Sequence, residues 1–269
     1  MKKHFTYKSP KQIWRILISD TDKLVIETRD MNTKEVFFNC YDLIAGKKIF
    51  TDFQPEEKYW IGIETIYKDI IIFHKYPKPD LPGHKEIIAI DLFSQKKLWS
   101  NSDYTYLFAY NDRIYCFNQG FEDRYFFSLN YLDGNLLAEL GTDSNKINSI
   151  NREAENQKDW SVYIYPEVYR YNNEGITKIV DEQTKNIDLI GEVEYNSYKN
   201  LTLFSFHAKV FEQSFVNRFF AVDTVSGKVK LSEVLNSNTP SLLTDSFFVY
   251  KNFLILLKEK NKLMIYNLE

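Results

Sequence analysis

One short phrase returns along this chain and constrains its fold more than any other feature. In residues 40–50 it consists of an apolar run that ends on Asp42, a polar turn that contains Gly46, and a second run that ends on Phe50. Three further copies occupy residues 90–99, 129–136 and 222–231. Because Asp and Asn bond to their own main chain in turns, the phrase predicts a strand, a tight turn and a second strand.

The copies are spaced regularly. Aligned on the residue that ends the first run, they fall at Asp42, Asp91, Asn130 and Asp223, and a truncated copy ends on Asn267. The intervals are 49, 39, 93 and 44 residues. Since the interval of 93 is about twice the others, we expect a degenerate copy within it. Residues 179–189, aligned on Asp181, would divide it into 51 and 42.

A second phrase alternates with the first. It places Lys or Asn, then Asp or Asn, after a Tyr, and it occupies residues 66–70, 109–113, 197–201 and 249–253. Such residues form hairpin turns. Each unit therefore holds four short strands, which in the first unit are residues 15–19, 23–29, 36–43 and 47–53. A period of about 40–50 residues with four strands is typical of a β-propeller blade.

The two ends of the chain fit a closed ring. The last unit offers three strands, residues 246–250, 253–258 and 262–267, and stops where a fourth is due. Residues 12–15 resemble fourth-strand residues 97–100, so we expect an N-terminal strand to complete the last blade and remove an exposed sheet edge. The predicted fold is all-β: one propeller domain over residues 1–269, with about six four-stranded blades. The alternative is five blades, with residues 142–189 as an insertion.

Composition agrees with this fold and excludes several kinds of protein. Aromatic residues make up 16% of the chain, against 9 Gly and 7 Pro, which favours strands. The charges nearly balance, with 34 Lys and Arg against 37 Asp and Glu, so we expect no nucleic-acid surface. Cys40 and Cys116 lie in apolar runs and predict buried thiols. Without an apolar signal segment or an apolar run of about 18 residues, we expect a cytoplasmic monomer with no membrane contact.

The pattern strand-Asp-x-x-x-Gly-Lys-x-x-Trp resembles the repeat of quinoprotein-like (pyrroloquinoline quinone type) propellers. In that family a Trp of the outer strand packs over the Gly turn of an adjacent blade. The matching positions are Gly46, Gly134 and Gly227 for the turn and Trp14, Trp99 and, as a substitute, Phe50 for the ring. Gln95 and Lys185 replace Gly in two copies. The chain also resembles small bacterial propeller proteins to which no function is assigned, so the resemblance implies a fold, with no activity and no cofactor.

Residues 142–160 depart from the pattern. They are polar and lack strand alternation, so we expect an irregular insertion or a short helix capped by Asn148 or Ser149. The Tyr-rich residues 160–170 that follow are broken by Pro166, which a central strand would not hold.

Few residues suggest chemistry. His74 and His84 flank a Pro- and Gly-rich stretch, and a metal ion there would also use Asp80 and Glu86. No ligand-spacing motif supports this, so we expect a stiff surface loop without a metal. Neither a phosphate-binding loop nor a nucleophile elbow occurs, so no catalytic residue is assigned. Glu64 and Glu194 precede the turn residues Asp69 and Asn200 by five and six positions, which suggests similar polar linings in two blades, and His207 suggests a structural histidine.

Variable loops are the best pointer to function. Connections between second and third strands differ in length, at residues 29–35, 75–86, 118–124 and 208–217. Loops of this kind on a rigid scaffold often carry recognition, although their aromatic residues can also simply cover sheet edges. The binding-face candidates are His74, Tyr76, His84, Phe121, Arg124, Phe211, Phe215 and Arg218. We therefore predict a non-enzymatic recognition or scaffold module that binds a protein or small ligand; the alternative is a hydrolase or lyase with a site at the mouth of the axial channel.

Overall fold

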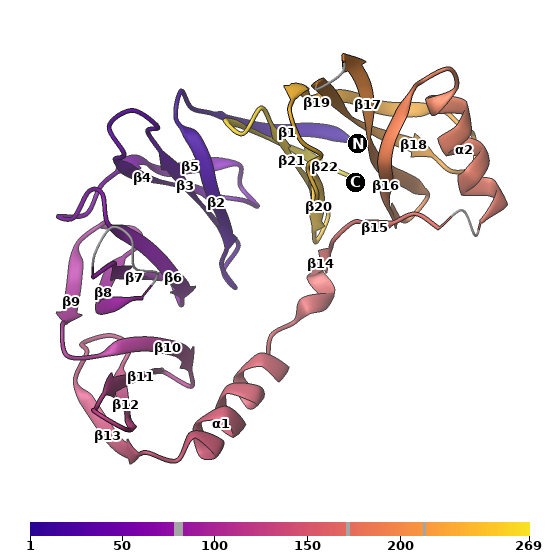
Figure 1. Ribbon diagram of the computed structural model, residues 1–269. Helices are drawn as coiled ribbons and strands as arrows, with labels where there is room; N and C mark the ends of the chain where they lie inside the picture. Colours follow the sequence, from indigo (N-terminus) through magenta and orange to yellow (C-terminus); the bar gives the residue numbers. More distant parts are fainter. Residues whose placement is uncertain (78–82, 171–172, 212–213) are drawn as a thin grey trace. The chain divides into compact units, whose positions relative to one another are not determined.

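The computed structural model describes residues 1–77, 83–170, 173–211 and 214–269. Within these ranges the chain forms five antiparallel sheets of four or five strands, together with two α-helices (Figure 1). The all-β class predicted from the two alternating phrases is confirmed. The chain divides into two compact units: an N-terminal unit, Lys11–Asp159, and a C-terminal unit, Trp160–Glu269 with Met1–Pro10.

The N-terminal unit contains three four-stranded sheets, in each of which the strands follow one another in sequence order. The first sheet is β2 (Gln12–Ile18), β3 (Lys23–Arg29), β4 (Val36–Asp42) and β5 (Lys47–Phe53). The second is β6 (Ile61–Tyr67), β7 (Ile70–Lys75), β8 (Lys85–Asp91) and β9 (Lys97–Asn101). The third is β10 (Thr105–Tyr110), β11 (Arg113–Gln119), β12 (Arg124–Asn130) and β13 (Leu136–Gly141).

The repeated phrase is a turn closed by its own acidic side chain. The Oδ1 of Asp91 accepts the main-chain N–H of Ser94 at 2.7 Å, and Asp42 and Asp223 bind the N–H three residues further on in the same way. Four residues after the acid the backbone is left-handed, at φ +65° for Gly46 and +57° for Gln95. Gln95 therefore occupies the position of the Gly, at the cost of a backbone conformation that favours Gly.

Neighbouring sheets of the N-terminal unit share apolar cores. Phe38 of the first sheet meets Phe73 of the second edge to face, with ring centroids 4.8 Å apart. Trp99 on β9 packs over the turn of the third sheet: a Cβ added to Gly134 would lie 2.6 Å from its ring, and its Nε1 donates to the Tyr131 carbonyl oxygen at 3.0 Å. This contact has the arrangement that the quinoprotein-like resemblance implied.

Trp14 does not have the role that the resemblance implied. It lies on β2, the first strand of its sheet, and not on an outer fourth strand. Its side chain is half exposed, and the Arg29 guanidinium lies 4.6 Å from its ring centroid. The Gly–Trp packing is therefore seen for one pair, and the quinoprotein-like repeat as a whole is not confirmed.

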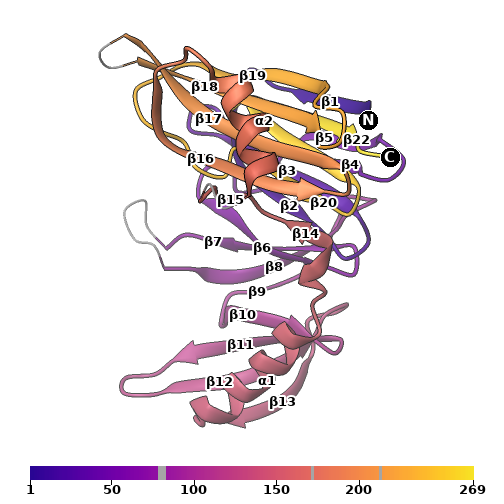
Figure 2. The same cartoon turned by 90° about the vertical axis from the view of Figure 1, so that its right-hand side faces the viewer.

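The C-terminal unit contains two five-stranded sheets (Figure 2). The first has the order β1 (Lys2–Lys8), β22 (Lys262–Asn267), β21 (Phe253–Lys258), β20 (Phe247–Tyr250) and β14 (Tyr163–Ile164). The second has the order β15 (Glu167–Val168), β16 (Leu189–Tyr198), β17 (Leu201–Phe211), β18 (Ser214–Asp223) and β19 (Val229–Thr239). As Pro166 predicted, β14 and β15 are separate two-residue edge strands.

An N-terminal strand completes the last sheet, but it is not the one we expected. Lys2–Lys8 pairs antiparallel with β22, from Lys2 opposite Asn267 to Lys8 opposite Lys262. Residues 12–15 instead begin β2. The break falls at Pro10, which has no N–H to continue the ladder. The short match of residues 12–15 to a fourth strand was therefore misleading.

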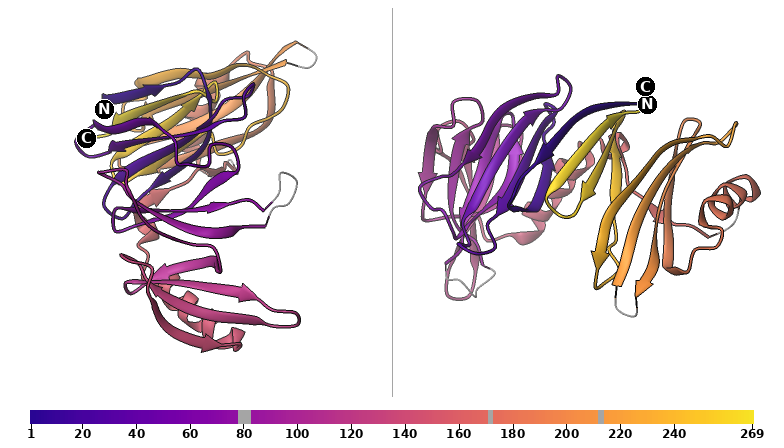
Figure 3. Two further views of the ribbon diagram at one scale, coloured as in Figure 1. Left: turned by 90° about the vertical axis from the view of Figure 1, so that its left-hand side faces the viewer. Right: turned by 90° about the horizontal axis from the view of Figure 1, so that it is seen from above.

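Each unit also contains a helix that covers one face of a sheet (Figures 1 and 3). Helix α1 (Ser144–Asn156) packs Ile147 and Ala154 against the sheet of β10–β13. Its N-cap is Asp143 rather than Asn148 or Ser149, because the Asp143 carboxylate accepts the N–H groups of Asn145 and Lys146 at 2.9 and 3.2 Å. Helix α2 (Glu174–Thr184) covers the sheet of β15–β19, as Figure 2 shows.

Residues 179–189 do not form the degenerate strand pair that we placed there. Residues up to Thr184 belong to α2, whose buried Ile176, Ile179 and Val180 have helical spacing. Asp181 is an exposed helix residue and not the end of a strand. The described ranges thus hold five sheets, and the predicted number of about six blades is not confirmed.

Cys40 and Cys116 are free and buried, as predicted.

Neither helix found in the described ranges has the length and hydropathy needed to cross a membrane.

Candidate functional site

Glu64 is aimed out of the regular ladder by a β-bulge. In the β6–β7 pair Ile63 lies opposite Phe73 and Thr65 lies opposite Ile72, so Glu64 is an extra residue on its strand. Bulges turn a side chain away from the direction that strict alternation would give it, and they are frequent beside functional sites. The Glu64 side chain is only 12% exposed.

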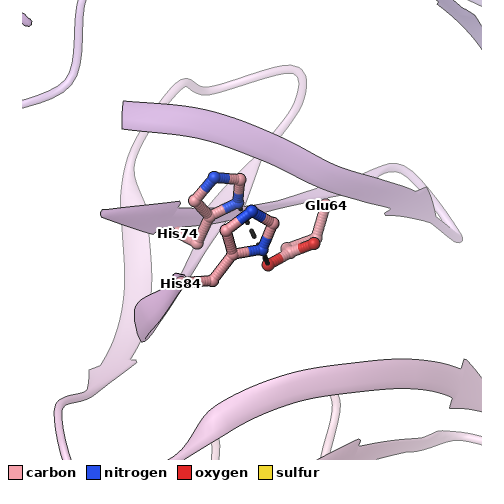
Figure 4. A group of neighbouring side chains, drawn as sticks. All are labelled: Glu64, His74 and His84. Carbon is pink, nitrogen blue, oxygen red and sulfur yellow. Dashed lines mark hydrogen bonds and ion pairs between the residues drawn. The ribbon is translucent and has the colours of Figure 1, made fainter. Parts of the chain in front are cut away.

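Two histidines converge on this carboxylate (Figure 4). The Nδ1 atom of His84 lies 2.7 Å from Glu64 Oε1, and the Nδ1 atom of His74 lies 3.0 Å from the same oxygen. The two imidazole rings are stacked, with centroids 3.5 Å apart and planes 7° from parallel. One ligand atom from each of the three residues can be chosen so that all lie within 4.8 Å of one another.

The surrounding residues hold the two rings in place. Gly62 is required beside His74, because a Cβ at Gly62 would lie 2.8 Å from His74 Cε1. The Tyr76 ring stands edge-on to both imidazoles, at 4.8 Å from His74 and 5.6 Å from His84. The Thr105 hydroxyl donates to the main-chain oxygen of His84 at 3.3 Å, which ties that residue to strand β10. The cluster thus draws on three strands, β6, β7 and β10, and on the residue before β8.

Burial and the neighbouring histidines shift the pKa of Glu64 in opposite directions. Burial by itself raises the pKa of this carboxyl, but the contacts with His74 and His84 outweigh burial and hold the pKa below its ordinary value. Burial also raises the pKa of Tyr106, and the nearby Glu64 charge adds to the effect. The cluster therefore holds an ionised carboxylate in a partly desolvated place.

His74 is buried without an aligned hydrogen bond. Its side chain is 1% exposed, and its Nδ1 lies 3.0 Å from Glu64 Oε1 without meeting the geometry of a regular hydrogen bond. In the described part of the chain neither ring nitrogen has a hydrogen-bond partner. Buried polar atoms in proteins nearly always have a partner, so these two nitrogens require an explanation.

The carboxylate near the histidines is not one that the sequence suggested. Glu86 is engaged in an ion pair with Lys75 at 2.8 Å. Asp80 lies outside the described residues. Glu64 was assigned only a polar lining role, although counting outward from the turn at Lys68–Asp69 places residue 64 close to 73 and 74. Counting strand positions from the turn could therefore have placed Glu64 near His74. The bulge that directs the Glu64 side chain toward His74 cannot be predicted from the sequence.

Two other binding-face candidates lie at the tip of the β11–β12 hairpin. The turn is closed by a hydrogen bond from the Gly120 N–H to the Asp123 carbonyl oxygen at 2.8 Å, and the Phe121 side chain is fully exposed. Arg124 is fixed at the base of the tip, since its Nε donates to Gln119 Oε1 at 3.1 Å and its guanidinium lies 4.8 Å from the centre of the Phe117 ring.

The remaining candidates belong to the C-terminal unit. Phe211 ends β17 with its side chain 73% exposed, whereas Phe215 and Arg218 on β18 are half-buried and pair across the ladder with Lys209 and Phe206. Residues 212–213, between the two strands, lie outside the described ranges.

Glu194 and His207 of the C-terminal unit have main-chain partners. Glu194 accepts the N–H of Asp245 at 2.9 Å, the N–H of Ser246 at 3.5 Å and the Ser205 hydroxyl at 3.2 Å. His207 Nε2 accepts the N–H of Leu243 at 3.1 Å. Both side chains thus fix the segment that leads into β20, which agrees with the structural role expected of His207.

Comparisons with known proteins give a match to one family model and distant similarities to solved structures. A family model described as a domain of unknown function (DUF4905) matches residues 18–99. No curated protein matches the sequence.

Solved structures offer only distant similarities. A europium-containing methanol dehydrogenase is 11% identical with a TM-score of 0.34, and the match covers 96% of this chain but only 51% of the enzyme. An uncharacterized protein from Listeria monocytogenes EGD-e is 12% identical with a TM-score of 0.37, and the match covers 97% and 95% of the two chains. An exo-beta-1,3-galactanase from Phanerochaete chrysosporium is 9% identical with a TM-score of 0.33, at coverages of 100% and 64%.

Proposed function

We propose that the protein is a non-enzymatic recognition module that binds a partner protein through the tip of the β11–β12 hairpin. One observation carries this proposal: Phe121 is fully exposed on a turn that a main-chain hydrogen bond closes. A turn that is already closed loses less conformational entropy on binding than an open loop does, and aromatic and Arg side chains are enriched at the centres of protein interfaces.

The size of the expected contribution follows from the burial of one ring. Transfer of a Phe side chain from water into an interface contributes about 2 kcal/mol, which corresponds to ~30-fold in the dissociation constant. Arg124 lies at the base of the same tip and supports the Phe117 ring, so a partner would meet an aromatic residue beside a fixed positive charge.

The test compares two exposed phenylalanines of the N-terminal unit. Phe121→Ser should weaken binding of the partner ~30-fold. Phe93→Ser, which changes a side chain 54% exposed on the turn after β8, should leave it unchanged. The wild-type protein and both variants are immobilised and exposed to lysate of the native cell, and retained proteins are quantified by mass spectrometry. The proposal requires a protein that saturates the wild type and Phe93→Ser but not Phe121→Ser.

If Phe121→Ser retains every protein as well as the wild type does, the proposal is wrong. Sedimentation of the purified chain provides the second arm, because a second copy could also cover the tip. The proposal predicts that the purified chain is a monomer. If it is a dimer, and the dimer dissociates in Phe121→Ser, then the occupant of the tip is a second copy of this chain and not a different protein.

The alternative, a hydrolase or lyase, is favoured by one observation, the convergence of Glu64, His74 and His84. Convergent carboxylate and imidazole groups are what such enzymes require. Screening of generic ester, phosphoester and glycoside substrates with the wild type and His84→Ala tests it: activity lost in His84→Ala would support this alternative and displace the recognition role.

A further inference from the structure

We infer that Glu64, His74 and His84 form a binding site for a divalent first-row transition-metal ion. This site is separate from the hairpin tip and would stand even if the recognition role failed. The donor set is two imidazole nitrogens and one carboxylate oxygen. Imidazole is a good ligand for Zn²⁺, Cu²⁺, Ni²⁺ and Fe²⁺, whereas Ca²⁺ and Mg²⁺ take sites made mostly of oxygen.

The ligand atoms lie close enough together to be gathered around one ion. Two ligands that each lie about 2.1 Å from a metal are about 3.0 Å apart at a right angle and about 3.4 Å apart at a tetrahedral angle. The Nδ1 atoms of His84 and His74 lie 2.7 and 3.0 Å from Glu64 Oε1. To admit the ion, these contacts must open by a few tenths of an ångström and one imidazole must turn out of the stack, because the lone pairs of two nearly parallel rings 3.5 Å apart do not meet at one point.

The second observation that points to a ligand is His74. It is almost completely buried and faces the cluster; its Nδ1 contacts Glu64 Oε1 at 3.0 Å without the geometry of a regular hydrogen bond, and its Nε2 has no hydrogen-bond partner among the described residues. A metal ion at Nδ1 would replace this poorly aligned contact with a directed bond. Gly62 leaves room for the ring at a place where any larger residue would displace it, so the backbone is adapted to this histidine.

Access and coordination number also fit. His84 is 36% exposed, so an ion can enter from solvent on its side. Three protein ligands leave at least one position for water or for a group of another molecule, as in zinc sites that are open to exchange. The ring of Tyr76 packs against both imidazoles, and the Thr105 hydroxyl fixes the main chain of His84, so both histidines are held near Glu64.

The test titrates chelator-treated protein with Zn²⁺ against a chromogenic competitor. The wild type should bind one equivalent, and Mg²⁺ or Ca²⁺ at the same concentration should not compete. Loss of a residue beside a metal ligand costs about 10–100-fold in affinity, so loss of a ligand should cost at least about 100-fold. His84→Ala and Glu64→Gln should both show this loss. His84 is exposed enough that its replacement leaves the fold intact, which circular dichroism verifies.

Two matched controls should bind Zn²⁺ like the wild type. Glu86→Gln changes the neighbouring carboxylate, which is paired with Lys75, and His4→Gln changes a histidine of the other unit. Co²⁺ gives a second readout, because its visible absorption should change in His84→Ala and stay the same in Glu86→Gln. Absence of saturable Zn²⁺ binding to the wild type, or wild-type affinity in both His84→Ala and Glu64→Gln, would overturn the inference and leave the cluster a structural ion pair.

Discussion

Glu64 and Glu194 occupy comparable places in the two units, near an irregularity in the pairing of β6 and of β16 and shortly before the hairpin turn that follows each strand. Their surroundings differ. Glu194 accepts two main-chain N–H groups and a hydroxyl, and His207 nearby accepts a third N–H. Among the described residues, the side-chain partners of the Glu64 carboxylate are two histidines, one of them without a regular hydrogen bond. The same residue types thus fix a chain segment in one unit and remain open to a ligand in the other.

The glycine turns differ in the same way. Gly134 and Gly227 follow their acidic or amide residue at the same spacing and have φ of +72° and +67°. Trp99 covers Gly134, whereas a Cβ at Gly227 would meet nothing within 4 Å. The repeated phrase therefore determines the backbone conformation of the turn. The side chains from other strands that lie over the turn determine how tightly it is packed. Substitutions at matched positions measure this difference between the units.

The largest effect should come from the two glycines. Gly134→Ala forces a side chain into left-handed backbone, at about 1–2 kcal/mol, and against the Trp99 ring, at about 1–3 kcal/mol more. Gly227→Ala has only the first cost. Urea unfolding should therefore find Gly134→Ala less stable by about 2 kcal/mol than Gly227→Ala.

Thiol labelling shows which unit each glycine substitution destabilises. Cys40 and Cys116 both lie in the N-terminal unit, and burial raises the pKa of each to about 12, so neither reacts with thiol reagents until that unit opens. Gly134→Ala should speed labelling of the thiols, and Gly227→Ala should not. Equal unfolding free energies for the two variants would contradict the packing role of Trp99.

The second effect compares the two carboxylates in metal-free protein. Glu194→Ala leaves the N–H groups of Asp245 and Ser246 without their acceptor, which should cost about 2–3 kcal/mol. Glu64→Ala removes contacts to a half-exposed and a buried histidine and frees no main-chain group, so it should cost about 1 kcal/mol or less. Denaturant unfolding with a chelator present measures both values. If Glu64→Ala lowers the free energy of unfolding by more than Glu194→Ala does, the cluster of Glu64, His74 and His84 mainly stabilises the fold, and the two carboxylates do not differ in the way described.

What the sequence could predict was local. The bond from Asp91 to Ser94 and the left-handed backbone at Gln95 lie within one turn, so the turn phrases predicted most strand boundaries of the β2–β5 sheet and of β20–β22. Helix α2 was missed because the regular interval was extended through residues 179–189, although Ile176, Ile179 and Val180 already had helical spacing. The carboxylate that completes the histidine cluster was missed because a bulge, which depends on the whole ladder, aims Glu64 at His74.

The smallest effect concerns His207 and the pH. Burial lowers the pKa of His207 below 6.5, and its Nε2 must stay unprotonated to accept the N–H of Leu243. As the pH falls below about 6.5, the unfolded chain therefore takes up a proton that the native chain resists, and stability falls until the native pKa is reached. His207→Gln keeps an acceptor without a titratable ring. It should match the wild type within about 1 kcal/mol at pH 8 and lose less stability than the wild type by pH 5.

Urea unfolding of both proteins at the two pH values measures this difference. His4→Gln is the control, and it should lose as much stability between pH 8 and pH 5 as the wild type does. If His207→Gln shows the full wild-type loss as well, protonation of His207 does not oppose the native state. The hydrogen bond from the Leu243 N–H to His207 would then contribute nothing measurable to the pH dependence of stability. The contrast between His207 and His74, which lacks a regular hydrogen bond, would be lost.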